Sequence, residues 1–239
     1  MLSLSILIEW RIGGATLSRF TAVSRVSDLT RLINTVLFDW DGTLFDSAST
    51  GLAAFQRTFH ELGVDFSLEF YEANYSPNWY TMYEALSIPR DRWGVADALW
   101  LQHYGDEPAN LVDGGRETIL ELRRRGYRLG IVTSGSYDRV TREIRALSLE
   151  SVFEAVVTNE STANKKPHPE GLERAMQLLN AERASCSYVG DAPEDIQMGR
   201  SARVLTVGVR SAYPTSRRLA DAHPDICLES ISDLLLHLS

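Results

Sequence analysis

The sequence predicts an α/β fold, a doubly wound parallel sheet with a second, small α-helical domain. From residue 34 onward, short apolar runs rich in β-branched residues alternate with segments of helical periodicity. This alternation is typical of a parallel sheet with helices on both faces. Between residues 64 and 110 it stops, and an aromatic-rich segment of helical character replaces it. The 239 residues suffice for one large domain with an insertion.

Each expected strand is a short apolar run that ends in polar residues. The expected strands are NTVLF, YRLGIVT, FEAVVT, CSYVG and VLTVGV, at residues 34–38, 127–133, 153–158, 186–190 and 204–209. The stretch TGLAAFQRTFHELG, residues 50–63, predicts a helix that ends at Gly63. Parallel sheets bind ligands at the carboxyl ends of their strands, so the polar residues there are the candidates for a site.

The aromatic-rich segment predicts several short helices, with turns at Ser76-Pro77, Pro89 and Gly105. Aromatic residues at this density usually form the core of a small helical domain. Inserted after the first strand, such a unit would lie above the strand ends as a lid. We therefore expect a core domain over residues 34–48 and 111–239 and a helical cap domain over 49–110. Residues 1–33 are expected to form a loosely attached, disordered N-terminal extension.

Composition limits the classes of partner. The formal charge of −8 argues against binding to nucleic acid or to an anionic membrane, because both need a basic surface. The two cysteines, Cys186 and Cys227, match no metal-ligand spacing and favour a reduced, cytoplasmic protein. The N-terminal LSLSILI is too short to span a membrane. We expect a small-molecule substrate and a monomer or homodimer.

Four polar clusters follow four of the expected strands. They are DWDGT, TSGS, KKPHP and GDAPED, at residues 39–43, 133–136, 165–169 and 190–195. Asp39 and Asp41 are only two positions apart, and two like charges so close together are costly unless a cation or a proton transfer uses them. Carboxylates, a hydroxyl with backbone amides, and a lysine at one sheet edge predict a site for a divalent cation and a phosphoryl group.

Lysine usage singles out the third cluster. The chain has 22 arginines but only two lysines, Lys165 and Lys166. A chain that otherwise uses arginine indicates here a site that needs a compact point charge. Lys166, directly before Pro167, is the predicted functional residue, and Lys165 is expected to be a solvated neighbour.

Taken in order, DWDGTLFDS, GIVTSGS, KKPHPE and YVGDAPEDI resemble the four motifs of the haloacid dehalogenase-like hydrolases. The resemblance covers residues 34 to 238 and is strongest to members with a helical cap after the first strand, such as phosphoglycolate phosphatases and β-phosphoglucomutases. It implies a Rossmann-like core and a phosphatase. The segment 75–93 does not match the cap signatures of either group, so the substrate is left open as a small phosphorylated metabolite.

The resemblance implies a role for each motif. Asp39 would be the nucleophile that becomes a phospho-aspartate, and Asp41 the general acid and base. Magnesium would bind to Asp39, to Asp191 and to the backbone carbonyl of Asp41. Phosphate oxygens would be held by Thr133, by the amides of Ser134 and Gly135, and by Lys166. Asp195 would orient Lys166 or a metal-bound water, with Glu194 as the weaker candidate for that role.

Three readings of the activity stay open. Dehalogenases of this family lack the second aspartate because a halide needs no proton, so Asp41 favours phosphoryl transfer. The leading reading is therefore a magnesium-dependent phosphatase. A phosphomutase of the β-phosphoglucomutase type would use the same residues. A catalytically idle binding or regulatory relative would be expected to lack one of Asp39, Asp41, Lys166 or Asp191, and all four are present.

Overall fold

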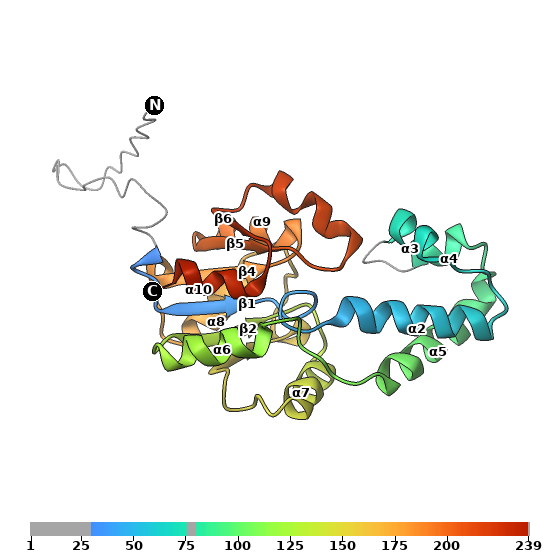
Figure 1. Ribbon diagram of the computed structural model, residues 1–239, viewed down its shortest axis with the longest axis horizontal. Helices are drawn as coiled ribbons and strands as arrows, with labels where there is room; N and C mark the ends of the chain where they lie inside the picture. The colour runs from blue at the N-terminus through green and yellow to red at the C-terminus, as the bar shows by residue number, and fades with distance from the viewer. Residues whose placement is uncertain (1–29, 76–79, 239) are drawn as a thin grey trace.

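The computed structural model describes residues 30–75 and 80–238, which are built around a six-stranded parallel sheet (Figure 1). The strand order is β3-β2-β1-β4-β5-β6. The chain starts at β1, adds β2 and β3 on one side, then returns to add the others on the other side. The predicted doubly wound α/β fold is confirmed. The strands are β1 Thr35–Phe38, β2 Arg128–Val132, β3 Ala155–Val157, β4 Cys186–Gly190, β5 Leu205–Val209 and β6 Ile226–Leu228.

β6 is not among the predicted strands. Its three residues are too few to show a periodicity. It is placed by its neighbour: Asp225, directly before it, accepts hydrogen bonds from the backbone N–H and the hydroxyl of Thr206 in β5, at 2.8 and 2.7 Å. The other five strands lie within the predicted runs.

Helices cover both faces of the sheet because alternate strand residues point to opposite sides. Val36 and Phe38 of β1 pack into one apolar cluster with α6, α7 and α10, whereas Leu37 packs into a second with α8 and α9. These helices are α6 Gly115–Arg124, α7 Tyr137–Ala146, α8 Glu170–Leu178, α9 Pro193–Ala202 and α10 Leu234–His237. Short 3-10 turns complete the sheet-associated part: η2 Asn159–Ser161, η3 Arg183–Ser185, η4 Pro214–Ala222 and η5 Ile231–Asp233.

Between β1 and β2 the chain forms a helical insertion, residues 47–106, which lies beyond the carboxyl end of β1 (Figure 1). Its elements are α2 Ser47–Glu61, α3 Leu68–Asn74, α4 Tyr80–Ala85, η1 Arg90–Arg92 and α5 Trp93–Asp106. Most of its aromatic side chains pack into an apolar cluster of its own, centred on Phe55, Phe59 and Tyr83. The aromatic density thus serves packing, as small helical cores usually require.

Two details of the insertion differ from the sequence prediction. α2 begins at Ser47 rather than at residue 50, because the Asp46 carboxylate caps it by accepting from the Ser49 N–H at 3.2 Å. The predicted turn at Gly105 is wrong, because α5 continues through this residue to Asp106. The predicted turn at Ser76-Pro77 lies outside the described residues.

The two connections between the sheet and the insertion run side by side. The Val112 N–H donates to the Leu44 carbonyl at 2.9 Å, and the Asp46 N–H donates to the Asn110 carbonyl at 3.0 Å. Phe45 and Leu111 form an antiparallel bridge between them. These bonds fix the point at which the insertion leaves the sheet, close to the ends of the predicted cap domain.

The predicted N-terminal extension, residues 1–33, lies outside the described residues as far as residue 29. Within its last four residues, Thr30 and Ile33 are buried, and Ile33 packs into the larger apolar cluster. No helix in residues 30–75 and 80–238 is long and apolar enough to cross a membrane.

The two cysteines should differ sharply in reactivity. Cys186 is fully buried in β4, and this burial raises the pKa of its thiol to about 11, whereas Cys227 is exposed. Since the thiolate is the reactive form, we expect a disulfide reagent to modify one thiol per native chain and both in denaturant. A Cys227→Ser variant should then show no rapid labelling; fast labelling of that variant would contradict the burial of Cys186.

Candidate active site

Neighbouring strands bring three predicted site residues to one edge of the sheet. Asp39, Thr133 and Asp191 each directly follow the last residue of β1, β2 or β4. These strands are adjacent in the order β2-β1-β4. Lys166 reaches the same edge from the loop before α8. The sequence motifs therefore converge because the sheet is parallel and all its carboxyl ends lie together.

Lys166 links two buried carboxylates. Its Nζ donates to Asp39 Oδ1 at 2.6 Å and to Asp195 Oδ1 at 2.7 Å. Burial alone would lower the pKa of Lys166, but the Asp195 and Asp39 carboxylates outweigh burial and raise the pKa well above its usual value. The lysine therefore stays charged. Lys165, by contrast, is exposed and donates to the backbone carbonyls of Asn159 and Thr162.

Both oxygens of Asp195 accept hydrogen bonds. Besides Lys166, its Oδ1 accepts from the Tyr188 hydroxyl at 3.1 Å, and its Oδ2 accepts from the Ala192 N–H at 3.1 Å. The neighbouring Glu194 is exposed, so Asp195 is the residue placed to orient Lys166. The Asp195 side chain fits here only because residue 190 is glycine: a Cβ atom on Gly190 would lie 2.3 Å from the Asp195 Cβ.

Asp191 completes a group of buried carboxylates. Its Oδ1 accepts from the Thr43 hydroxyl at 3.2 Å, and its Oδ2 accepts from the Ser211 hydroxyl at 2.6 Å. Burial, and next the charge of Asp195, raise the pKa of Asp191 to about 7. Burial also raises the pKa of Asp39 well above its usual value, against the opposing charge of Lys166. The group carries more negative charge than Lys166 alone can balance.

This group suits a hard divalent cation. One carboxylate oxygen from each of Asp39, Asp191 and Asp195 lies within 4.8 Å of the others, and carboxylate oxygens are the ligands that Mg²⁺ prefers. Asp195 accepts three hydrogen bonds, from Lys166, Tyr188 and Ala192. Asp191 accepts only one hydroxyl at each oxygen, and Asp39 accepts from Lys166 at Oδ1, so these two carboxylates keep more acceptor capacity for an ion. The residues present therefore fit the predicted magnesium site.

The Asp41 side chain is not part of this group and has a different partner. Its two oxygens accept from the two terminal nitrogens of Arg139 in α7, Oδ1 from Nη1 at 2.9 Å and Oδ2 from Nη2 at 2.6 Å. The pair is about three-quarters buried. The Asp41 side chain therefore faces Arg139, a residue outside the four sequence motifs. The predicted magnesium ligand is a different group of the same residue, its backbone carbonyl.

Trp40, between the two aspartates, is part of the same network. Its indole is fully buried, stacks on Phe45 with ring centroids 5.5 Å apart, and donates from Nε1 to Glu143 Oε2 at 2.8 Å. Glu143, itself buried, accepts from Arg139 Nη1 at 3.2 Å. Trp40 thus positions the Glu143 carboxylate, which in turn binds Arg139.

The loop after β2 presents a hydroxyl to the site. The Gly135 N–H donates to Thr133 Oγ1 at 3.0 Å. This differs from the expectation that the Gly135 amide faces a phosphate, but it leaves the hydroxyl hydrogen of Thr133 available to donate outward. Ser134 follows Thr133 and is exposed in the same loop.

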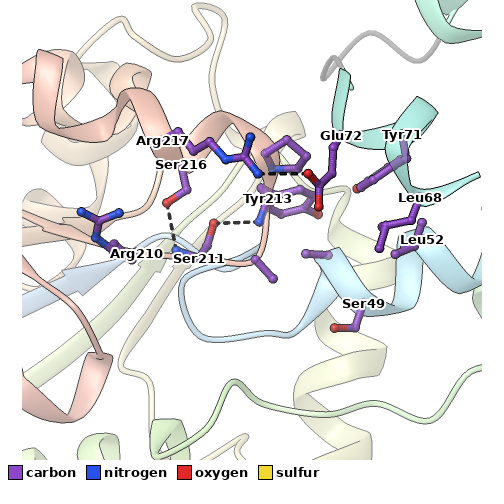
Figure 2. Close-up of a pocket in the computed structure, with 13 residues that line it drawn as sticks. Ser49, Leu52, Leu68, Tyr71, Glu72, Arg210, Ser211, Tyr213, Ser216 and Arg217 are labelled. Carbon is purple, nitrogen blue, oxygen red and sulfur yellow. Dashed lines mark hydrogen bonds and ion pairs between the residues drawn. The ribbon is translucent and has the colours of Figure 1, made fainter. Parts of the chain in front are cut away.

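On the other side, the loop after β5 connects the site to the insertion. A cavity of about 320 Å³ lies between α2, α3 and this loop. Figure 2 shows its lining residues, among them Arg217, which is paired with Glu72 of α3 at 3.0 Å. Tyr213 lines this cavity, and its ring lies close to Asp191, because a Cβ on Gly42 would come within 2.8 Å of the ring and 2.6 Å of Asp191 Oδ2. The Tyr213 hydroxyl bonds to Ser47 at 2.9 Å, and its ring stacks on Tyr75 of the insertion at 5.2 Å.

A family model for haloacid dehalogenase-like hydrolases matches residues 36–209. The chain belongs to this family. The predicted membership and the predicted hydrolase class are therefore confirmed, and the helical insertion after β1 corresponds to the expected subgroup.

Relatives extend over most of the chain. It is 33% identical over 210 residues to the pyrophosphatase PpaX of Listeria monocytogenes, which covers 87% of this chain and 97% of the relative. Identity to the pyrophosphatase PpaX of Bacillus anthracis is 32% over 222 residues, with the same coverage. A predicted phosphoglycolate phosphatase from Haemophilus somnus superposes with a TM-score of 0.75 at 20% identity, covering 87% of this chain and 99% of that one, which shows the shared fold.

Several residues of the site were not predicted from the sequence. Arg139, Tyr188 and Ser211 contact the predicted site residues Asp41, Asp195 and Asp191. Glu143 contacts Arg139 in turn. Arg139 and Glu143 lie four residues apart on α7, a spacing that places both on one face. That spacing is the sequence signal for the pair, but it does not say which helix face meets Asp41.

Gly190→Ala should disturb the site without replacing any of its charged residues. The new Cβ would overlap Asp195, so we expect the free energy of unfolding to fall by about 1–3 kcal/mol, as for overpacked cores. Chemical denaturation measures this change. Gly94→Ala is the matched control, because no atom lies within 4 Å of a Cβ there. Equal stability of the two variants would contradict the close contact at Gly190.

Proposed function

We propose that the chain is a magnesium-dependent phosphatase that hydrolyses a small phosphorylated metabolite through a phospho-aspartate on Asp39. The observation that carries this proposal is the buried group at the strand ends. There Lys166 contacts Asp39 and Asp195 at 2.6 and 2.7 Å, and Asp191 lies within the same 4.8 Å cluster. A charged lysine beside a carboxylate cluster suits the binding of a phosphoryl group together with a cation.

Asp39 is proposed as the nucleophile. Lys166 holds its Oδ1, which leaves Oδ2 to attack phosphorus while the bond from phosphorus to the leaving oxygen breaks. Lys166 and the hydroxyl of Thr133 would bind the phosphate oxygens as charge develops on them. A bound Mg²⁺ would add charge neutralisation for the phosphoryl oxygens, held by Asp39, Asp191 and the Asp41 backbone carbonyl.

Asp41 is proposed to serve both half-reactions. It would donate a proton to the leaving oxygen, then accept one from the water that hydrolyses the phospho-aspartate. The hydrolysis restores the Asp39 carboxylate and releases phosphate. In the structure Asp41 is paired with Arg139, so its carboxylate must exchange that partner, at least in part, to reach the reacting oxygen.

The relatives add a substrate candidate to those expected from the sequence. Phosphoglycolate and sugar phosphates are the substrates that the motif resemblance suggests, and the relatives named pyrophosphatase add inorganic pyrophosphate. These names favour hydrolysis over the phosphomutase alternative. A cytoplasmic location and a monomeric or homodimeric state stay predictions from the sequence.

Asp39→Asn should abolish turnover. We expect phosphate release from a panel of pyrophosphate, phosphoglycolate and sugar phosphates, measured with magnesium, to fall by about a thousandfold or more, because the amide is a poor nucleophile. Chelation of magnesium from the parent should have a comparable effect. Asp65→Asn, at an exposed position of the insertion, is the matched control. Activity of Asp39→Asn equal to that of the parent would rule out the phospho-aspartate.

A further inference from the structure

Arg139 occupies a position between the predicted phosphate loop, Asp41 and the helical insertion. A Cβ on Gly135 would lie 2.5 Å from its Nη2, so the guanidinium lies directly against the loop that carries Thr133. Nη1 also donates to the hydroxyl of Tyr104 in α5 at 3.3 Å. The guanidinium therefore lies between the loop that carries Thr133 and helix α5 of the insertion, next to Asp41.

The carboxylates at this edge would repel an anionic substrate, so positively charged side chains are needed to bind it. Among the residues that the structure describes, five carboxylates meet two cations there. Lys166 contacts Asp39 and Asp195, and Arg139 contacts Asp41 and Glu143. Asp191 is the fifth. Lys166 faces the nucleophile and hence the phosphoryl group that is transferred. The part of the substrate beyond the leaving oxygen lies toward Asp41, and there the facing cation is Arg139.

We infer that Arg139 is a specificity-determining residue that binds an anionic leaving group, a second phosphate where the substrate is pyrophosphate. This inference rests on the proposed function. A guanidinium that already binds both oxygens of Asp41 offers the same planar pair of N–H donors to two phosphate oxygens. The incoming phosphate takes the place of the Asp41 carboxylate at the fork, which frees Asp41 to turn toward the reacting oxygen.

The reaction with pyrophosphate is balanced without a further reactant. An oxygen of Asp39 bonds to one phosphorus as the bridging P–O bond breaks. The bridging oxygen keeps the electron pair, takes the proton of Asp41 and leaves as part of the phosphate bound at Arg139, so Asp41 is then ionised. Water then attacks the phospho-aspartate and gives a proton to Asp41. The products are two phosphate ions and the restored Asp39 carboxylate.

Glu143 and Trp40 are positioning residues for Arg139. Glu143 accepts from both Arg139 Nη1 and the Trp40 indole, so the ring between the two motif aspartates fixes the arginine through one carboxylate. When a phosphate displaces Asp41, Glu143 still holds the guanidinium. Trp40→Phe keeps the ring and removes the N–H, so it should change substrate preference in the same direction as loss of Arg139, by a smaller factor.

The test compares pyrophosphate with p-nitrophenyl phosphate, whose leaving group carries no second phosphate. The ratio kcat/KM includes only the steps through departure of the leaving group, so hydrolysis of the phospho-aspartate does not enter it. For Arg139→Gln we expect kcat/KM to fall about 10- to 100-fold more for pyrophosphate than for p-nitrophenyl phosphate. An equal fall for both substrates would overturn the inference.

Two further variants test whether the planar guanidinium of Arg139 itself is required. Arg139→Lys retains the charge without the planar fork, so its preference for pyrophosphate should lie between those of the parent and Arg139→Gln. Arg142→Gln, an exposed arginine on the same helix, should leave the ratio of the two kcat/KM values at the parent value. A loss of pyrophosphate preference in Arg142→Gln as large as in Arg139→Gln would count against a specific role for Arg139.

Binding of imidodiphosphate, a pyrophosphate analogue with a nitrogen bridge, tests the same contact without turnover. By calorimetry with magnesium, Arg139→Gln should raise its Kd about tenfold or more. An unchanged Kd would overturn the inference, whatever the turnover. A parent that binds the analogue through Arg139 but releases no phosphate from any substrate would instead overturn the proposed function and leave the role of Arg139 standing.

Discussion

The burial of carboxylates at the ends of β1 and β4 is the constraint on which the rest of this site depends. An ionised carboxylate taken out of water is costly unless a charge or several donors compensate it. The protein meets this cost with Lys166 and Arg139, each of which contacts two carboxylates, and with hydroxyl donors from Thr43, Tyr188 and Ser211. The remaining excess of negative charge is what makes the site suitable for a divalent cation.

The two cations divide the site into halves with different surroundings. Lys166 lies in the sheet-associated half, where Asp195 and Tyr188 hold it against the nucleophile. Arg139 lies in the half that borders the helical insertion and contacts Tyr104 there. A substrate that joins a transferred phosphoryl group to an anionic leaving group would place one charge in each half. Under the proposed function, residues of the sheet-associated core, and not only those of the insertion, would therefore contribute to the choice of substrate.

The sequence predicted residues near the strand ends better than residues on helices. Asp39, Thr133 and Asp191 each follow a strand directly, and in a parallel sheet this alone places them at one edge. Lys166 was singled out by the chain's lysine usage, and the role of Asp195 came from the family motifs. Arg139 and Glu143 escaped prediction because charged residues on an amphipathic helix usually face solvent, and only packing of α7 against the sheet turns this pair inward. β6 escaped because three residues show no periodicity.

By itself the sequence determined the fold class, the family and the candidate residues, because strand periodicity and motif spacing are local properties of the chain. The tertiary structure decided how those residues are paired. It turned the Asp41 side chain to Arg139 and connected Trp40 to that arginine through Glu143. These contacts join residues up to 103 positions apart. The free energy of such pairs depends on burial and mutual distance, which arise only when the sheet, its helices and the insertion are packed together.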